Sequence, residues 1–351
     1  LKSWRAPCIQ TCSSLSRTGL FTLMGVAILA TLTLLSVITG STSIPLGVVR
    51  DAISMGLGLS DSDPTPMSRI ILDLRLPRAL FAAIIGAGLG IVGVVLQTTT
   101  RNDLADPFLF GLSSGAAAGA VFVITVTGDI LGIWTLPLAA FCGGIIASAI
   151  VLTLVRALRS GAPEKLILAG LAVSFLFTAI TNYLIFSGDS RAAHSVVFWM
   201  LGGLGLARWT NMWIVILGLG LIFAFAFFSH RKLDALLTGD TTATSLGVRV
   251  QGLRMQMFFV AALATAAFVS VAGVIGFIGL MVPHLARGIV GPLHIRLIPA
   301  AALCGAMLLT ASDILSRILL APQELPVGIV TTSLGAVFVF VLLIGGSRMR
   351  R

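Results

Sequence analysis

The most constraining feature of this sequence is a series of apolar runs of about 20 residues, the length that a helix needs to cross a hydrocarbon core of roughly 30 Å. Residues 20–37, from Leu20 to Val37, form one such run and contain no charged residue. A membrane β-strand would alternate apolar and polar side chains, which these runs do not. Because backbone groups in lipid must be hydrogen-bonded internally, a helical bundle is the remaining solution. The sequence therefore predicts an all-α, polytopic membrane protein.

Composition excludes a soluble globular protein. The chain has 351 residues, of which 57% are hydrophobic and only 10% are charged, and its mean hydropathy is +1.06. A soluble domain carries about 25% charged residues. Too little polar surface is left to cover a water-facing globule, so lipid must be the main solvent.

We expect about ten transmembrane helices, of which the eighth is short and Gly-rich and is interpreted as a partial or tilted helix. The basic, Ser-rich opening could precede a signal-peptide core, but the first apolar run is too long for one and lacks a clear cleavage site. The predicted organisation is a tail (1–19), a transmembrane domain (20–346) and a second tail (347–351). The expected spans are 20–40, 78–98, 108–127, 134–155, 166–186, 211–229, 255–274, 277–290, 297–319 and 327–346.

The distribution of charge orients these spans. With the N-terminus placed in the cytoplasm, 16 of the 23 Lys and Arg residues fall at cytoplasmic ends, whereas the other face holds seven basic and seven acidic residues. Cytoplasmic loops of membrane proteins carry such an excess of Lys and Arg. The net charge of +10 is therefore a sign of topology and not of nucleic-acid binding, and both termini are predicted to be cytoplasmic in a bacterial inner membrane.

Motifs for catalysis, metal binding and ATP binding are missing from the sequence. No GxxxxGK[ST] phosphate loop occurs, and His, Cys and carboxylate residues do not cluster with ligand or catalytic spacing. We therefore expect no enzyme activity, no metal site and no cofactor of the chain's own. The frequent small-xxx-small spacing, as in residues 86–90 and 115–119, is typical of close helix packing in membranes.

Arginines stand out where few charges occur. Arg75 and Arg78 flank a proline at the outer end of the second span, where they could be interfacial anchors or could present cationic forks to carboxylates of a soluble partner. Within the ninth span Asp313 and Arg317 are four residues apart, so they can pair on one helix face. The pair is interpreted as structural, with a transport role as the alternative. A chain of buried carboxylates, which a proton-coupled pump needs, does not occur.

Two other segments interrupt the pattern of spans. The stretch Arg231–Arg254 has a centre that is predicted to form a short helix, with Asp240 or Thr241 as N-cap and Gly247 just beyond its end. It is either a surface linker or a helix that fits a groove on a partner. The stretch Gly273–Arg287 contains Gly residues and Pro283, which indicate a break in the helix or tight packing, and His284 is interpreted as structural.

Taken in order, short motifs between Leu72 and Leu343 resemble the permeases of the iron-siderophore, haem and cobalamin ABC importer family. Two departures from that family are Asp103, where a proline is usual, and Val337, where a proline is also common. The matching pieces are Arg75–Arg78; Gln97 with Arg101–Pro107; Leu112–Ala116; Leu168–Gly170; Phe198–Gly203; Ala243–Gly247; Gly276–His284; Asp313 with Arg317; and Glu324–Pro326 with Gly328–Gly335.

The resemblance implies a cobalamin-importer-type permease fold that performs alternating access with partners. These are a second permease copy or a paralogue, ATPase subunits that bind the ATP, and a substrate-binding protein, all around a chain embedded in membrane lipid. The expected cargo is an iron–siderophore complex, with haem or cobalamin as the alternative; an ion-coupled secondary transporter is the rival mechanism. The resemblance implies that Arg75, Arg78 and Arg317 dock the binding protein. It implies that a segment of about 234–248 couples to the ATPase, through Thr238, Gly239, Asp240, Thr241, Ala243, Leu246 and Gly247. It also implies that the cytoplasmic gate contains Asn102, Asp103, Leu104, Ala162 and Pro163.

Overall fold

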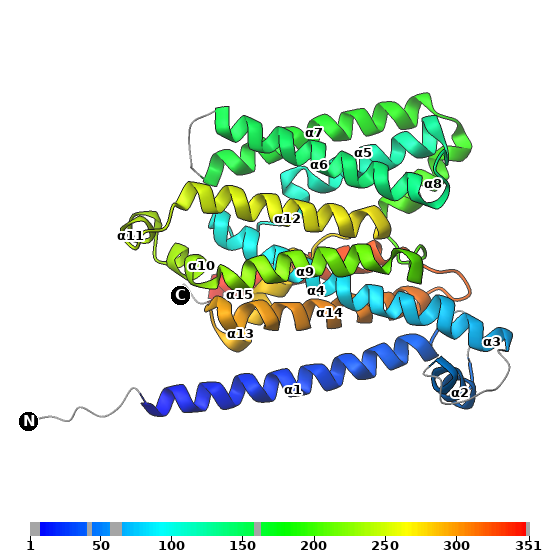
Figure 1. Cartoon of the computed structure of the whole chain (residues 1–351), viewed down its shortest axis with the longest axis horizontal. Helices are drawn as coiled ribbons and strands as arrows, with labels where there is room; N and C mark the ends of the chain where they lie inside the picture. Colours follow the sequence, from blue (N-terminus) through cyan, green and yellow to red (C-terminus); the bar gives the residue numbers. More distant parts are fainter. Residues whose placement is uncertain (1–7, 41–43, 57–64, 158–162, 349–351) are drawn as a thin grey trace, which may run out of the picture.

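Long helices, roughly parallel to one another, make up the bundle (Figure 1). The structure is a computed structural model that describes residues 8–40, 44–56, 65–157 and 163–348. Within these residues there are helices and no strand, as the sequence predicts. Those that run along the bundle are α1 (Cys8–Ile38), α4 (Leu76–Thr100), α5 (Leu112–Phe122), α6 (Thr135–Ala157), α7 (Pro163–Ser187), α9 (Met212–Phe228), α12 (Val250–Ala272), α13 (Ile278–Val290), α14 (His294–Ile318) and α15 (Val327–Arg348).

Short helices lie at the ends of the bundle, except η2, which lies against the middle of α7. We call the two ends the α11 end, where α1 begins and α15 ends, and the α2 end (left and right in Figure 1). The short elements are α2 (Leu46–Gly56), α3 (Pro66–Arg69), η1 (Ile70–Arg75), η2 (Pro107–Phe110), η3 (Val123–Thr127), η4 (Gly132–Trp134), α8 (Ser190–Met200), η5 (Trp209–Asn211), α10 (His230–Leu237) and α11 (Asp240–Ser245).

The ten predicted spans are confirmed as helices. In the described part of the chain, eight helices are long and apolar enough to cross a membrane, and two shorter apolar helices, Leu112–Thr127 and Ile278–Val290, account for the third and eighth predicted spans. Of the two readings of Gly273–Arg287, a break is found between α12, which ends at Ala272, and α13, which begins at Ile278, whereas Pro283 lies inside α13. The tails 1–7 and 349–351 lie outside the described residues.

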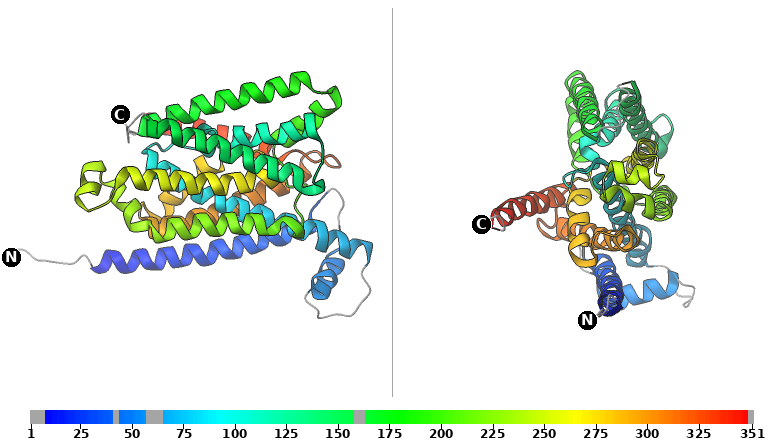
Figure 2. Two further views of the ribbon diagram at one scale, coloured as in Figure 1. Left: turned by 45° about the horizontal axis from the view of Figure 1, so that its top comes forward. Right: turned by 90° about the vertical axis from the view of Figure 1, so that its left-hand side faces the viewer.

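The core of the bundle is built around α4 and α12. The most apolar windows of these two spans are 83% and 78% buried, whereas that of α1 is 17% buried. Lipid-facing helices can remain apolar on their outer side because the hydrocarbon is as apolar as leucine. The view along the bundle (Figure 2, right) shows α15 projecting from one side, away from α10 and α11.

Small residues bring α4 and α14 into backbone contact. A Cβ atom added to Gly305 would meet the carbonyl oxygen of Gly86, and one added to Gly86 would meet that of Gly305. The predicted role of the Gly-rich spacing in close packing is therefore confirmed at this crossing.

We expect Gly305→Val to destabilise the bundle by about 3 kcal/mol or more, since two backbones must separate to admit the side chain. Thermal unfolding of the purified protein in detergent measures the effect. Gly220→Val is the matched control, because an added Cβ at Gly220 has no atom within 4 Å. Equal unfolding midpoints for the two variants would contradict the packing argument.

Candidate functional site

A cluster of charged side chains lies inside the α2 end of the bundle. Arg78 Nε donates to Oδ1 of Asp313 at 2.9 Å, and its Nη1 donates to Oε2 of Glu324 at 2.6 Å. Arg317 Nη2 lies 2.8 Å from Oδ2 of Asp313, an ion pair by distance that lacks hydrogen-bond geometry. The predicted pairing of Asp313 with Arg317 is confirmed, and Arg78 is a further partner from α4.

Arg75 and Arg317 bind the carbonyl oxygens at the end of α1. Arg75 Nη1 donates to the carbonyl oxygens of Val37 (3.1 Å) and Ile38 (2.7 Å). Arg317 Nη1 donates to the carbonyls of Ser36 and Thr39, both at 2.9 Å. The last carbonyls of a helix have no partner within the helix, so these arginines act as a C-cap provided by distant parts of the chain.

The three arginines that the resemblance assigns to docking, Arg75, Arg78 and Arg317, do not form a row of exposed guanidinium groups. Arg75 is 7% and Arg317 2% exposed, because both side chains turn inward to the end of α1. Arg78 is the most accessible of the three, with a side chain 15% exposed. It borders a hollow of about 390 Å³ at the α2 end that Glu324 and Trp199 also line.

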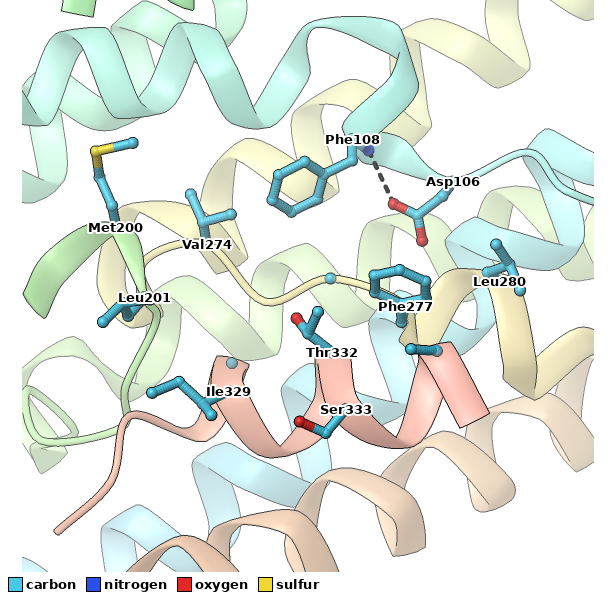
Figure 3. A pocket seen from close by; sticks show the side chains of 13 residues that line it. Asp106, Phe108, Met200, Leu201, Val274, Phe277, Leu280, Ile329, Thr332 and Ser333 are labelled. Atoms are coloured by element: carbon cyan, nitrogen blue, oxygen red, sulfur yellow. Dashed lines mark hydrogen bonds between the residues drawn. The ribbon is translucent and has the colours of Figure 1, made fainter. Parts of the chain in front are cut away.

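A larger hollow of about 700 Å³ lies beside α15 (Figure 3). Its wall comes from the unwound segment between α12 and α13, from α15, from the end of α8 and from η2. Phe277 has a left-handed backbone conformation (φ +68°) at the start of α13, and its ring lies against Gly335 of α15. The lining is mainly apolar, with Asp106, Thr332 and Ser333 as polar members.

Asp106 connects two elements that line this hollow. Its Oδ1 accepts a hydrogen bond from the backbone N–H of Phe108 at 2.9 Å, so the side chain caps η2. Its Oδ2 lies against the first turn of α13, 3.3 Å from the position of a Cβ added to Gly279. Burial raises the pKa of Asp106 to about 6, against the hydrogen bond from Phe108, which lowers it.

The raised pKa gives a pH prediction. The folded protein binds the Asp106 proton up to about pH 6, whereas the unfolded chain loses it near the ordinary aspartate pKa of 3.8. The stabilisation is therefore present below about pH 4 and is lost as the pH rises through about 6. We expect Asp106→Asn to remove this slope from the unfolding midpoint measured between pH 4 and pH 7, relative to wild type. An unchanged slope would show that Asp106 does not titrate there.

The predicted coupling segment forms two short helices, α10 and α11, at the α11 end. Leu237 and Leu246 are 48% and 66% exposed, whereas Leu233, Leu236 and Ala243 are buried against the bundle. Of the other residues in the predicted set, Gly239 and Asp240 are half-buried, and Thr238, Thr241 and Gly247 are exposed. The N-cap prediction is wrong: Gly239 (φ +113°) is the N-cap, since only glycine adopts this conformation easily. Gly247 (φ +82°) follows the helix as predicted.

Asp240 ties α11 to the membrane-spanning helices. Its two carboxylate oxygens accept from Nη1 and Nη2 of Arg254 in α12, both at 2.9 Å. Arg101, at the end of α4, places Nη2 2.7 Å from the same carboxylate. Bidentate arginine–carboxylate pairs fix geometry as well as charge.

A second link joins α10 to α4 and α14. Asp234 Oδ1 lies 2.7 Å from Nδ1 of His294 and also accepts from the His294 backbone N–H. The other ring nitrogen of His294 lies 2.8 Å from Oγ1 of Thr98. The α10–α11 segment is thus held to α4, α12 and α14 by side chains whose partners lie far apart in the sequence.

The predicted gate loop lies next to α13. Asn102 Oδ1 accepts from the backbone N–H of Leu104 at 2.9 Å. Asp103, the departure from the family pattern, lies 3.1 Å from Nη1 of Arg287, which also donates to Gln97 Oε1 at 2.8 Å. Leu104 is half exposed. Pro163 begins α7, and Ala162, the other residue of this part of the predicted gate, lies outside the described residues.

A polytopic helical bundle with a broken helix beside a hollow is typical of membrane transport proteins. Residues 28–345 match the FecCD transport family. The chain belongs to this family, and it is a transport subunit of the ABC importer type and not an enzyme.

Two curated relatives and one solved structure support the assignment to this family. The chain is 38% identical to the hemin transport system permease protein HmuU of Yersinia pestis over 81% of this chain and 86% of that protein. It is 37% identical to the Fe(3+) dicitrate transport system permease protein FecD of Escherichia coli K12 (80% and 86%). A metal-chelate type ABC transporter solved in an inward-facing conformation superposes with a TM-score of 0.80 at 29% identity, over 93% of this chain and 98% of that one.

Proposed function

We propose that this chain is the permease half of an importer that moves an iron–siderophore complex into the cytoplasm by alternating access, driven by a partner ATPase. Support for the cargo comes from relatives, which include permeases for ferric dicitrate and for iron(3+)-hydroxamate. Haem and cobalamin are the second candidates, because hemin and cobalamin permeases are equally similar. The mainly apolar hollow of about 700 Å³ suits a bulky chelate that is recognised by shape.

The observation that carries the ATP-driven mechanism is the α10–α11 segment. It presents exposed Leu237 and Leu246 beyond the spans while Asp240 and Asp234 hold it to α4, α12 and α14. A partner that binds these leucines would move the helices with the segment. The excess of basic residues at this end supports a cytoplasmic location for it and for both termini in a bacterial inner membrane. The loop at Asn102–Leu104, with Pro163, then lies at the cytoplasmic gate.

A second permease chain completes the proposed path. The hollow is bounded by α15 on one side, and α15 projects from the bundle (Figure 2) with Phe340 and Val341 64% and 65% exposed. Packing of a second copy or a paralogue against this side would enclose the hollow. The mass of the purified complex in detergent tests the dimer, and a single permease chain per complex would contradict it.

Reconstitution in liposomes separates this mechanism from the ion-coupled alternative. We expect uptake of radiolabelled ferric hydroxamate only when the cognate ATPase and ATP are present together with the binding protein. Parallel assays with labelled haem and cobalamin decide the cargo. Uptake by the permease alone, driven by an ion gradient, would establish a secondary transporter instead.

Docking of the binding protein is expected to depend on Arg78, the most accessible arginine of the predicted set. Arg78→Ala should weaken binding of the binding protein about thirtyfold or more, since it removes a partly desolvated charge from an interface. Surface plasmon resonance on the reconstituted permease measures this. Arg78→Lys, which keeps the charge, is the control, and the unfolding midpoint separates loss of docking from loss of the contacts to Asp313 and Glu324. Unchanged binding by a folded Arg78→Ala variant would refute the docking role.

A further inference from the structure

A hollow of about 600 Å³ lies at the α11 end, between α10, the connection from α11 to α12, and the first turns of α12. Arg231, Lys232 and Arg249 line it, and its lining includes no carboxylate. All three basic side chains belong to exposed residues. This group, which we call the basic hollow, is distinct from the ion pairs that hold the α10–α11 segment.

The charges of the basic hollow are not neutralised from within the described part of the chain. Arg101 and Arg254 pair with Asp240, and Arg287 pairs with Asp103. By contrast, no described carboxylate lies within 4.0 Å of the basic groups of Arg231, Lys232 or Arg249. Three unpaired cations around one concave space favour an anionic ligand.

The backbone adds to this preference. Arg249 is the N-cap of α12 and makes no side-chain cap, so the first backbone N–H groups of the helix lack partners within it. The 23-residue helix also has the positive end of its dipole here. Gly252, in the first turn, lines the hollow, and nothing but Cβ of Arg249 lies within 4 Å of the Cβ it would carry.

The depth of the basic hollow in the membrane indicates which kind of anion it binds. The apolar span of α9 ends at Phe228, which is 84% exposed, and Arg231 and Lys232 follow within about one helical turn. The polar headgroup layer of a bilayer extends roughly 5–7 Å beyond the hydrocarbon on each side. The basic hollow therefore lies at the depth of lipid phosphates, and Figure 2 (right) places this part of the chain on the side of the bundle away from α15.

The surface beside the hollow is apolar on its membrane side. Gln256 lines the hollow, and Phe259, three residues further into the span, is 44% exposed. An anion with an acyl chain would place its phosphate among the cations and its chain along these exposed aromatic side chains. Basic pockets between membrane helices on the cytoplasmic side bind anionic lipid headgroups in this way.

We propose that the basic hollow binds the phosphate headgroup of one anionic phospholipid. Leu246 and Gly247 form part of its wall, so the bound lipid would support the proposed coupling segment. That consequence rests on the proposed function, whereas the lipid site does not.

The test is native mass spectrometry of the full-length chain in detergent, titrated with phosphatidylglycerol or phosphatidylcholine. We expect one phosphatidylglycerol to bind in preference to phosphatidylcholine. Arg231→Gln combined with Arg249→Gln should weaken that binding about thirtyfold, the effect of removing two charges near a membrane surface. Arg231→Lys combined with Arg249→Lys should retain it.

The matched control is Arg156→Gln combined with Lys165→Gln. It removes the same charge from the last turn of α6 and the first turn of α7, which are consecutive helices. Equal losses in the two double variants would mean general charge attraction and would overturn the site, as would unchanged binding in the Arg231 and Arg249 variant. If that variant keeps phosphatidylglycerol but loses the ATPase subunit, the hollow binds a protein and the lipid assignment is wrong. Loss of the lipid with ATPase binding intact supports the site, even if the coupling proposal fails.

Discussion

Asp313→Ala is expected to lower the free energy of unfolding by about 3–5 kcal/mol, the cost of leaving a buried charge without its partner. Asp313 is fully buried and lies between the guanidinium groups of Arg78 and Arg317. Without its carboxylate, the positive charge of Arg317 would remain 2% exposed, with only neutral oxygens of α1 and its own helix as hydrogen-bond partners. Release of Arg317 would also free the end of α1.

Chemical or thermal unfolding in detergent measures this loss, and Glu324→Ala is the matched control. Glu324 accepts from the same Arg78 but has a side chain that is 40% exposed, so its removal should cost at most about 1 kcal/mol. A loss for Asp313→Ala no larger than that for Glu324→Ala would refute the buried-charge argument. Normal stability with abolished transport would instead support the transport role that the sequence leaves open for Asp313.

The sequence predicts this cluster only in part. Asp313 and Arg317 could be paired because a helix places residues four apart on one face. Arg78 lies 235 residues from Asp313, and no local rule brings α4 and α14 together at that point. The resemblance assigns Arg75 and Arg317 to docking, and the sequence does not show that their guanidinium groups reach the carbonyl oxygens at the end of α1.

At the α11 end, the sequence predicts the short helix and the glycine that follows it, but it misplaces the N-cap, which is Gly239, and does not predict the contacts between helices. Gly247 ends a short helix and could be recognised from the turn chemistry of glycine. The links of Asp240 to Arg254 and of Asp234 to His294 cross from one helix to another, and composition does not encode them. The hollow beside α15 is built from four separate parts of the chain, so motifs name many of its residues but do not place them around one space. Asp106 is one of these residues, and the sequence does not show that it is buried.

Leu237→Asp is expected to weaken binding of the ATPase subunit about a hundredfold, because a carboxylate would be forced unpaired into an apolar contact. Leu237 is 48% exposed at the end of α10 while Leu233 and Leu236 of the same helix are buried, so the side chain is available without being needed for the fold. Leu246→Asp, in α11's C-cap, should act similarly. Pull-down of the ATPase with detergent-solubilised permease measures the effect.

Ser245→Asp is the control, since it adds the same charge to an exposed position of α11 next to Leu246. We expect this variant to retain most ATPase binding, whereas both leucine variants lose it together with ATP-driven uptake in liposomes. Leu246 also borders the basic hollow but Leu237 does not, so a loss shared by both variants cannot come from the lipid site. Full ATPase binding by Leu237→Asp and Leu246→Asp would remove the coupling role from α10 and α11. The ion pairs of Asp240 and Asp234 would then serve only to hold a surface loop against the bundle.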